Sequence, residues 1–179
     1  MNDYLEITAT CTPDLEIEGL CNFSLNGSFD GKNVARLEAY RLCDRPFEIR
    51  KDSKRLYDVF DTISAYAFGL AKDVHAYSNK IAQMTGDPLC CGFLGITKIE
   101  VDKSHRGKDI GKQLISYLQE LHEGMDWIVG LQAVPLEFME GREDACKAMQ
   151  KRLIDHYLRM GFEQPAQKKC AHLLIAYWD

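Results

Sequence analysis

Residues 92–178 alternate between strand-like and helix-like patterns, and this alternation constrains the fold more than any other feature of the sequence. Strands are predicted where β-branched and aromatic residues cluster, and helices where apolar residues recur every three or four positions. The alternation predicts a mixed α/β fold with helices on both faces of the sheet. The expected order is strand Gly92–Val101, helix Gly107–His122, strand Trp127–Ala133, helix Asp144–Met160 and strand Ala171–Trp178.

The first half of the chain predicts strands followed by a long helix. The segment Asn26–Gly31 lies between two strand-like runs and indicates a hairpin with a longer loop. Apolar residues then recur at helical spacing up to the turn signal at Gly86-Asp87-Pro88. The predicted elements are a strand over Tyr4–Thr12, hairpin strands over Leu15–Ser24 and Val34–Leu42, a helix over Lys54–Val74 capped by Asp52 or Ser53, and a short helix over Ser78–Gln83.

Length and composition indicate a soluble globular protein. The 179 residues fit one domain with a buried core, so we expect a single domain over residues 1–179. The formal net charge of -5 argues against a general nucleic-acid surface. The seven cysteines form no C-x-x-C pair and do not cluster with the five histidines, which argues against a zinc site. Because no signal peptide and no membrane-length apolar run is visible, we expect a cytoplasmic protein without a membrane partner.

The turn Val101–Lys112 leaves a predicted strand and opens a predicted helix, and it is rich in glycine and positive charge. Gly107 and Gly111 let backbone N–H groups point outward and a bulky ligand approach. Together with the positive end of the helix dipole, these groups form an anion site. Four cations surround the turn and two carboxylates oppose them, which favours a phosphorylated ligand. The cations are Lys103, Arg106, Lys108 and Lys112, and the carboxylates are Asp102 and Asp109.

Two common phosphate motifs do not fit this turn. A nucleotide P-loop needs four residues between its first glycine and Gly-Lys-Ser/Thr, whereas three separate Gly107 from Gly111 and Gln113 follows Lys112. The dinucleotide fingerprint G-x-G-x-x-G needs a glycine at position 109, which is Asp109.

The turn resembles the pyrophosphate loop of the GNAT (GCN5-related) N-acetyltransferase superfamily, which reads Arg/Gln-x-x-Gly-x-Gly/Ala. Arg106, Gly107, Lys108, Ile110 and Gly111 match that loop. Three other segments are similar to family features in the same order, so that the resemblance covers roughly residues 90 to 178. They are Ile99-Glu100-Val101 (the strand end that pairs with pantetheine), Leu131–Leu136 (the next strand) and Tyr157–Phe162 (an aromatic-x-x-x-Gly-Phe helix end).

The resemblance implies a GNAT-like acyl-CoA N-acyltransferase fold, with a central, mostly antiparallel twisted sheet that contains a splayed strand pair. Residues 1–89 would form the acceptor side and residues 90–179 the half that binds acetyl-CoA as co-substrate, without a metal. The implied reaction transfers an acetyl group directly to a primary amine of a small molecule or peptide. The family also allows a homodimer. The implied coenzyme-binding residues are Ile99, Val101, Arg106, Gly107, Lys108, Asp109, Ile110, Gly111 and Lys112.

Asp109 departs from the family loop, which usually has glycine at this position. A carboxylate there can cap the N–H groups that a phosphate needs. It also repels phosphate, by about 1 kcal/mol or less where water screens the charge.

The chemistry needs a route for two protons. An alkyl ammonium with a pKa of about 10.4 must lose a proton before it attacks, and the leaving thiolate benefits from a donor. The resemblance assigns the donor to Tyr157, although Ala145, Met149, Leu153 and Tyr157 also form a stripe typical of a helix core. Glu100 is the candidate base, and the alternative is a Lys98–Glu100 ion pair on a partly open sheet face.

Two other functions stay open on the sequence. The first is an acyl-CoA-binding or degenerate homologue without turnover, which Asp109 and the absence of a clear base favour. The second is an interaction protein that uses the fold as a scaffold.

Overall fold

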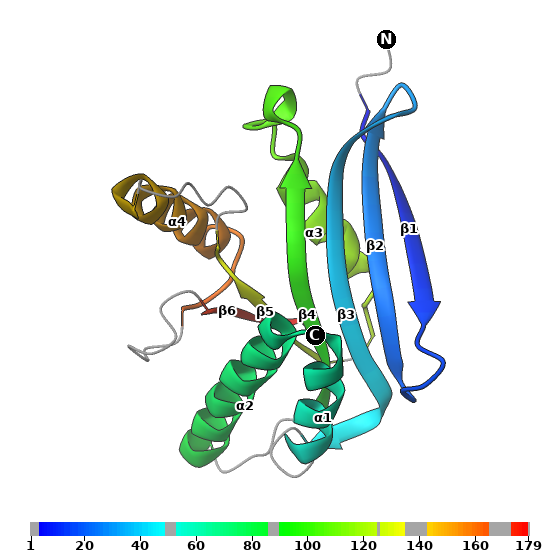
Figure 1. Ribbon diagram of the computed structural model, residues 1–179, viewed down its shortest axis with the longest axis vertical. Helices are drawn as coiled ribbons and strands as arrows, with labels where there is room; N and C mark the ends of the chain where they lie inside the picture. The colour runs from blue at the N-terminus through cyan, green and yellow to red at the C-terminus, as the bar shows by residue number, and fades with distance from the viewer. Residues whose placement is uncertain are drawn as a thin grey trace.

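A single sheet with the strand order β1-β2-β3-β4-β5-β6 forms the centre of the protein (Figure 1). The computed structural model describes residues 4–48, 53–85, 90–124, 126–134, 143–164 and 173–178. All neighbouring strands are antiparallel except β4 and β5, which are parallel. The structure therefore confirms the predicted mixed α/β class and the mostly antiparallel sheet.

The first three strands form a meander with a shorter turn than the sequence suggested. The strands are β1 (Glu6–Pro13), β2 (Leu20–Phe29) and β3 (Lys32–Glu48). Only Asp30 and Gly31 connect β2 to β3, with φ values of 49° and 74° that are typical of a type I′ turn. The predicted long loop is wrong, because Asn26 and Gly27 lie inside β2. Gly27 instead makes room for Leu5, whose Cδ1 would lie 3.1 Å from an added Cβ.

Two helices replace the predicted long and short helix of the first half. They are α1 (Ser53–Ile63) and α2 (Ala65–Thr85), so the predicted helices over 54–74 and 78–83 were divided at the wrong place. The break lies at Ser64, whose Oγ accepts a hydrogen bond from the N–H of Ala67 at 3.1 Å and caps α2. Asp52, the side chain of Ser53 and the predicted stop at residues 86–88 lie outside the described part of the chain.

The second half follows the predicted order. Its elements are β4 (Cys90–Val101), a short 3₁₀ turn (Lys103–His105), α3 (Ile110–Glu120), β5 (Trp127–Gln132), α4 (Glu143–Leu158) and β6 (Leu173–Trp178). Helix α3 begins three residues later than predicted, because Gly107 and Asp109 have left-handed backbone conformations (φ 79° and 55°) that a right-handed helix excludes.

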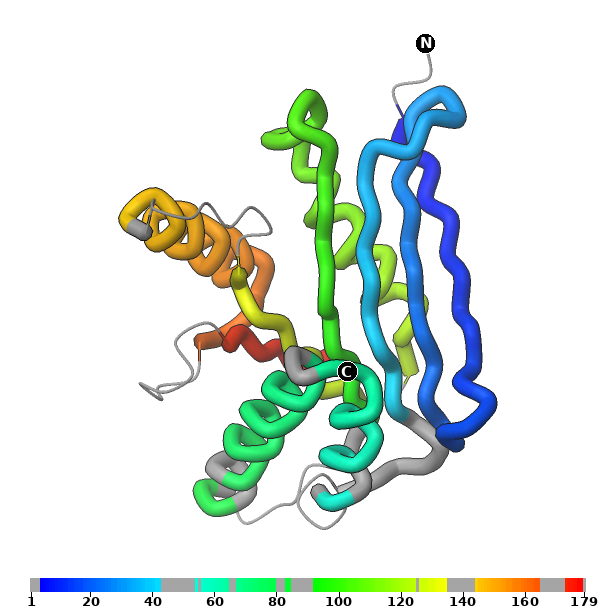
Figure 2. The backbone as a smooth tube through the Cα atoms, in the orientation of Figure 1, coloured from blue at the N-terminus to red at the C-terminus, as the bar shows by residue number. Residues whose placement is uncertain are grey.

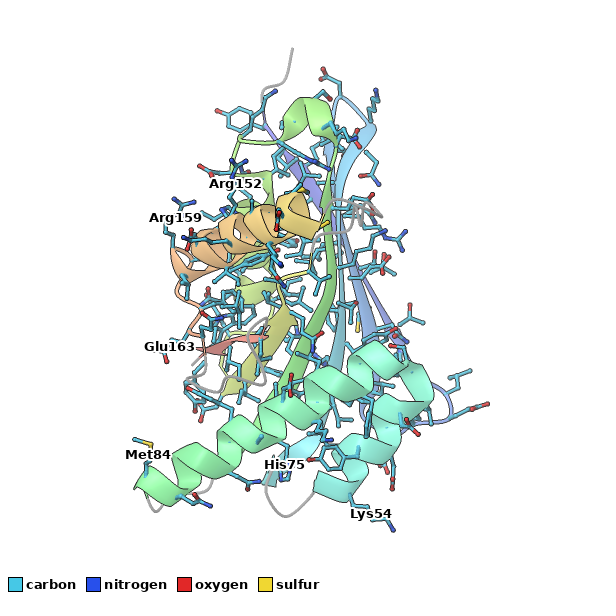
Figure 3. The ribbon with its side chains drawn as sticks, turned by 60° about the vertical axis from the view of Figure 1, so that its left-hand side comes forward. Lys54, His75, Met84, Arg152, Arg159 and Glu163 are labelled. Carbon is cyan, nitrogen blue, oxygen red and sulfur yellow. The ribbon has the colours of Figure 1, made fainter. Side chains whose placement is uncertain are left out.

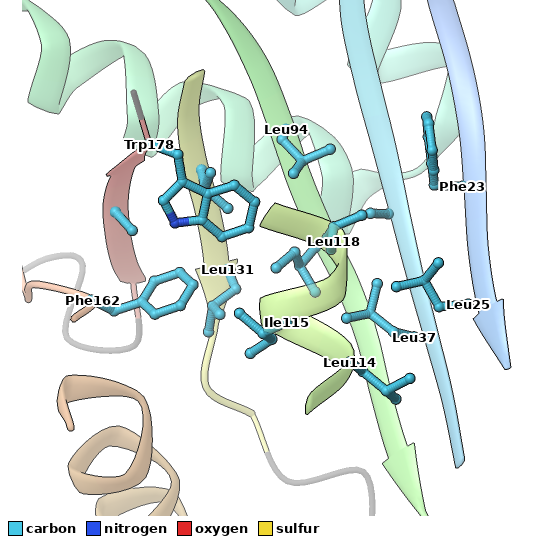
Figure 4. Close-up of a cluster of buried hydrophobic side chains, with 14 of the residues drawn as sticks. Phe23, Leu25, Leu37, Leu94, Leu114, Ile115, Leu118, Leu131, Phe162 and Trp178 are labelled. Atoms are coloured by element: carbon cyan, nitrogen blue, oxygen red, sulfur yellow. The ribbon is translucent and has the colours of Figure 1, made fainter. Parts of the chain in front are cut away.

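Each face of the sheet carries its own buried apolar cluster. On one face, α3 packs its buried Leu114, Ile115 and Leu118 against strand residues such as Leu37, as Figure 4 shows. On the other face, α1 and α2 cover Phe93 of β4 with residues such as Phe60 and Leu70. Half-buried side chains of α4 pack against the α3-side cluster. The prediction of helices on both faces is thus confirmed.

None of the helices in the described part of the chain is both long and apolar enough to cross a membrane.

Candidate functional site

Strand β4 diverges from its parallel neighbour β5 halfway along its length. The pairing runs from Gly92–Trp127 to Ile96–Leu131, after which β4 continues to Val101 (Figure 2). Thr97 is the extra residue of a β-bulge, because Lys98 pairs with Glu38 and Ile96 pairs with Ala39. A bulge bends its strand, so Thr97 accounts for the divergence. The predicted splayed strand pair is present, but the sequence offered no sign of this bulge.

The end of β4 presents backbone groups to the opening beside β5. The N–H of Asp102 donates to the carbonyl of Val34 in β3 at 2.8 Å. Because backbone direction alternates along a strand, Ile99 and Val101 direct their N–H and C=O groups to the opposite side. The Nε of Arg106 donates to the carbonyl of Val101 on that side, at 3.1 Å. An extended ligand can pair with such an edge as a further strand does.

The loop between β4 and α3 leads directly into the first turn of the helix at Ile110. The first hydrogen bond of the helix runs from the N–H of Gln113 to the carbonyl of Asp109, at 3.0 Å. The N–H groups of residues 110, 111 and 112 precede it and have no partner within the helix. Together with the helix dipole, these three N–H groups are compatible with the anion site that the sequence predicted, which stays a prediction.

Asp109 takes its place in the loop without capping the helix. Its backbone is left-handed (φ 55°, ψ 19°), and its side chain makes no capping hydrogen bond. The expectation that its carboxylate caps the N–H groups of α3 is therefore wrong. A left-handed position explains why glycine suits this place, since aspartate adopts that conformation at some cost.

Positive charge gathers around these N–H groups. Lys103, Arg106, Lys108 and Lys112 are all exposed, as is Asp109. The Nε of Arg106 is engaged by Val101, so this side chain also ties the loop to β4. His105 stacks on Phe29 of β2, with ring centroids 5.7 Å apart, and holds the loop against the β2–β3 hairpin. No pattern in the sequence indicated this second attachment.

Gly111 has no structural reason to lack a side chain. Its φ is not left-handed, and an added Cβ would meet only the Cγ2 of Ile99 at 3.8 Å, which is an ordinary contact. Glycine in a helix is less stable than alanine by about 0.5–1 kcal/mol. A phosphate group that approaches the backbone closely would account for glycine here, so the residues present fit a phosphorylated ligand.

The segment Tyr157–Phe162 forms the end of α4 and the start of the return to the sheet. The N–H of Phe162 donates to the carbonyl of Tyr157 at 3.2 Å, and the N–H of Gly161 donates to that of Leu158 at 3.2 Å. With Gly161 at φ 90°, this pattern is a Schellman C-cap. The rings of Tyr157 and Phe162 pack 6.0 Å apart. The aromatic-x-x-x-Gly-Phe pattern thus also has a structural cause, and Tyr157 is half-buried against the α3-side core.

Glu100 lies on the opposite face of β4 from Ile99 and Val101. Its Oε2 is 2.8 Å from the Nζ of Lys98, and its side chain is 53% exposed. The hydrogen bond from Lys98, followed by the positive charge of Lys98, lowers the pKa of Glu100. The structure therefore has the ion pair that the sequence left open as an alternative to a base. It brings Ile99, Val101 and residues 106–112 together on the α3 side and leaves Glu100 on the other face.

Helix α4 borders the opening between β4 and β5. The Nε2 of Gln150 donates to the carbonyl of Ala133, just beyond the end of β5, at 3.1 Å. This contact and the packing of Leu153 and Tyr157 on the α3-side core fix the position of α4.

The described residues contain no group of three or more histidine, cysteine, aspartate or glutamate side chains that can hold a metal ion.

No protein-family model matches the sequence, and no curated protein shows a significant sequence match. The chain resembles solved structures of GNAT N-acetyltransferases. A tyrosine-to-phenylalanine mutant of KacT has 12% identity and a TM-score of 0.46, covering 89% of this chain and 71% of KacT. The polyamine N-acetyltransferase of Drosophila melanogaster has 11% identity and a TM-score of 0.46, and the match covers 86% of this chain and 74% of that protein. AtaTR bound with AcCoA has 11% identity and a TM-score of 0.42, and the match covers 89% of this chain and 70% of that protein. The chain is similar to these proteins, and its function is inferred from its own loop, β4 edge and α4.

Proposed function

We propose that this chain is an N-acetyltransferase that moves an acetyl group from acetyl-CoA to a primary amine. The observation that carries the proposal is one juxtaposition. The N–H groups at the start of α3, which have no partner within the helix, lie next to the β4 edge that has separated from β5. A long thioester with a pyrophosphate needs both features, one for the phosphates and one for the extended pantetheine arm.

The residues divide this binding task between backbone and side chains. The N–H groups of residues 110–112 hold the pyrophosphate, and the amide groups of the pantetheine arm pair with the backbone of Ile99 and Val101. Lys108 and Lys112 add positive charge, while Arg106 fixes the loop to Val101. In this arrangement the thioester lies in the opening where β4 and β5 diverge.

The reaction proceeds by direct attack in a ternary complex. The neutral amine nitrogen attacks the thioester carbonyl carbon, the C–S bond breaks, and the thiolate takes a proton. We assign the donation of that proton to Tyr157, whose half-buried side chain packs on the α3-side core. The amine releases its own proton to water or to a carboxylate. Glu100 suits this second role less well, because its pairing with Lys98 lowers its pKa and weakens it as a base.

A second candidate function is acyl-CoA binding without turnover. The ion pair between Glu100 and Lys98 favours it, since it engages the predicted base. Asp109 favours it too, because its carboxylate stands among the groups that would hold phosphate.

Two measurements separate these functions. A ligand at 100 times its dissociation constant stabilises a protein by about 2.7 kcal/mol. For a chain of this size, we therefore expect acetyl-CoA to raise the unfolding temperature by roughly 5–10 °C. Pantetheine, which lacks the phosphates, is the control and gives a smaller shift. Thiol release is then followed with a panel of small-molecule and peptide amines.

Binding with thiol release supports the transferase, and binding without release from any amine supports the binding module. No thermal shift at millimolar acetyl-CoA would refute both functions.

A further inference from the structure

Helix α4 carries a row of basic side chains that the acetyl transfer itself does not use. Arg152, His156 and Arg159 are spaced at i, i+4 and i+7, which places them on one side of the helix. Arg152 and Arg159 are exposed and His156 is half-buried, so the row runs along one border of the face that packs on the core. Lys147 and Lys151 lie along the opposite border.

This row is on the side of α4 that is turned toward the β4–α3 loop. Figure 3 shows Arg152 and Arg159 on the upper side of α4, which is the side of the loop end of β4. The electrostatics agree with this placement. Burial lowers the pKa of His156, Arg159 lowers it further, and the carboxylate of Asp109 raises it. Asp109 in the loop is therefore within electrostatic range of His156 on α4.

Among the described residues, no ion pair engages the two arginines. In the part of the chain that the structure describes, α4 has one ion pair, between Lys147 and Asp144 at 3.8 Å, and neither Arg152 nor Arg159 takes part in one. Asp155 is the carboxylate nearest to them along the helix. A guanidinium presents a planar set of donors that matches a phosphate in a bidentate manner, so a pair of arginines suits a phosphomonoester dianion.

Coenzyme A has two separate anionic groups, the pyrophosphate and the phosphomonoester on its ribose. The loop N–H groups can hold one of them, and the other needs a second cationic surface nearby. We propose that Arg152 and Arg159, with His156 between them, bind the ribose 3′-phosphate and select coenzyme A over its dephosphorylated form. This inference rests on the proposed function, since it names a second contact for the same ligand.

The test compares acetyl-CoA with acetyl-dephospho-CoA, which lacks only the 3′-phosphate. Calorimetric titration gives the dissociation constant of each ligand for the wild type and for the Arg152→Ala/Arg159→Ala double variant. We expect the wild type to bind acetyl-CoA at least tenfold more tightly than the dephosphorylated ligand. In the double variant this preference should fall to about twofold or less, while affinity for the dephosphorylated ligand stays unchanged. Both arginines are exposed, and the unfolding temperature checks that the variant keeps its fold.

The matched control is Lys147→Ala/Lys151→Ala, which removes the same charge from the other border of α4. It should leave the preference for the 3′-phosphate intact. If the arginine variant loses affinity equally for both ligands, or if the lysine variant has the same effect as the arginine variant, the row contributes only a general positive charge. Either result would overturn the inference. If the wild type binds both ligands equally well, the inference fails and the proposed function stands. If it binds neither, both fail.

Discussion

Replacing Gly111 by alanine should raise the stability of the fold and weaken its ligand binding. In the folded chain the new methyl group meets only Ile99, at 3.8 Å, so nothing opposes the better helix propensity of alanine. We expect a gain of up to about 1 kcal/mol, which raises the unfolding temperature by about 2–4 °C. The same methyl group stands beside the N–H groups that would contact a phosphate. Loss of one such charge-assisted hydrogen bond costs about 1.5–3 kcal/mol, or roughly ten- to a hundredfold in affinity.

The assay is calorimetric titration with acetyl-CoA together with urea unfolding of the same samples. Gly69→Ala is the matched control, because Gly69 lies inside α2 and an added Cβ there would meet only Gln132 at 3.9 Å. It should stabilise the chain to a similar degree and leave affinity unchanged. Undiminished acetyl-CoA affinity in Gly111→Ala would refute the placement of the phosphate at the start of α3, whatever the effect on stability.

Three further predictions concern single side chains. Asp109→Gly removes both the cost of a left-handed backbone at aspartate and the negative charge, so it should tighten acetyl-CoA binding severalfold. Asp109→Asn removes the charge alone and so separates the two effects. Unchanged affinity in both variants would show that the carboxylate does not compete with phosphate. Tyr157→Phe removes the hydroxyl that would donate the proton, so turnover should fall at least tenfold. The variant keeps the ring packing on Phe162, so acetyl-CoA affinity should stay unchanged. Turnover equal to that of the wild type would show that Tyr157 is not the proton donor. Burial lowers the pKa of the 4%-exposed His122 below its ordinary 6.5, so stability is fully present above pH 6.5 and is lost as pH falls below it. Urea unfolding at pH 5.5 and 7.5 should show this loss in the wild type and a smaller one in His122→Asn, where an amide replaces the imidazole N–H that donates to Leu118.

The alternation of strands and helices after residue 90 could be predicted because local pattern and final packing agree there. Leu114 and Leu118 have helical spacing, and they are the residues that α3 buries. The anion site at the loop stays a prediction, which rests on the glycine and charge pattern of the loop and on the start of α3, where Asp109 makes no capping hydrogen bond.

Other features depended on contacts between distant residues. Asn26-Gly27 and Asp30-Gly31 have the same turn chemistry, and the pairing of β2 with β3 decides between them. Apolar spacing continues through Ser64, so the break between α1 and α2 was visible only in the cap that Ser64 forms. Thr97 looks like any strand residue, and only the register of β4 against β3 shows that it is a bulge.

Glu100 shows a limit of a different kind. Its alternation with Lys98 fixed the face on which it lies but not the environment of that face. The two side chains pair with each other at 2.8 Å on an exposed surface. A base held in this way has a lowered pKa, which no pattern in the sequence indicates.

An NMR titration of the isotopically labelled protein with acetyl-CoA tests the central claim most directly, because it reports on the loop amides themselves. We predict saturable binding, with the largest backbone amide shifts in Gly107–Lys112 and further shifts at Ile99 and Val101. Pantetheine should move the β4 amides and leave those of the loop nearly unchanged. The absence of shifts at millimolar acetyl-CoA, or saturable shifts centred away from the start of α3, would contradict the assignment of this loop as the phosphate site.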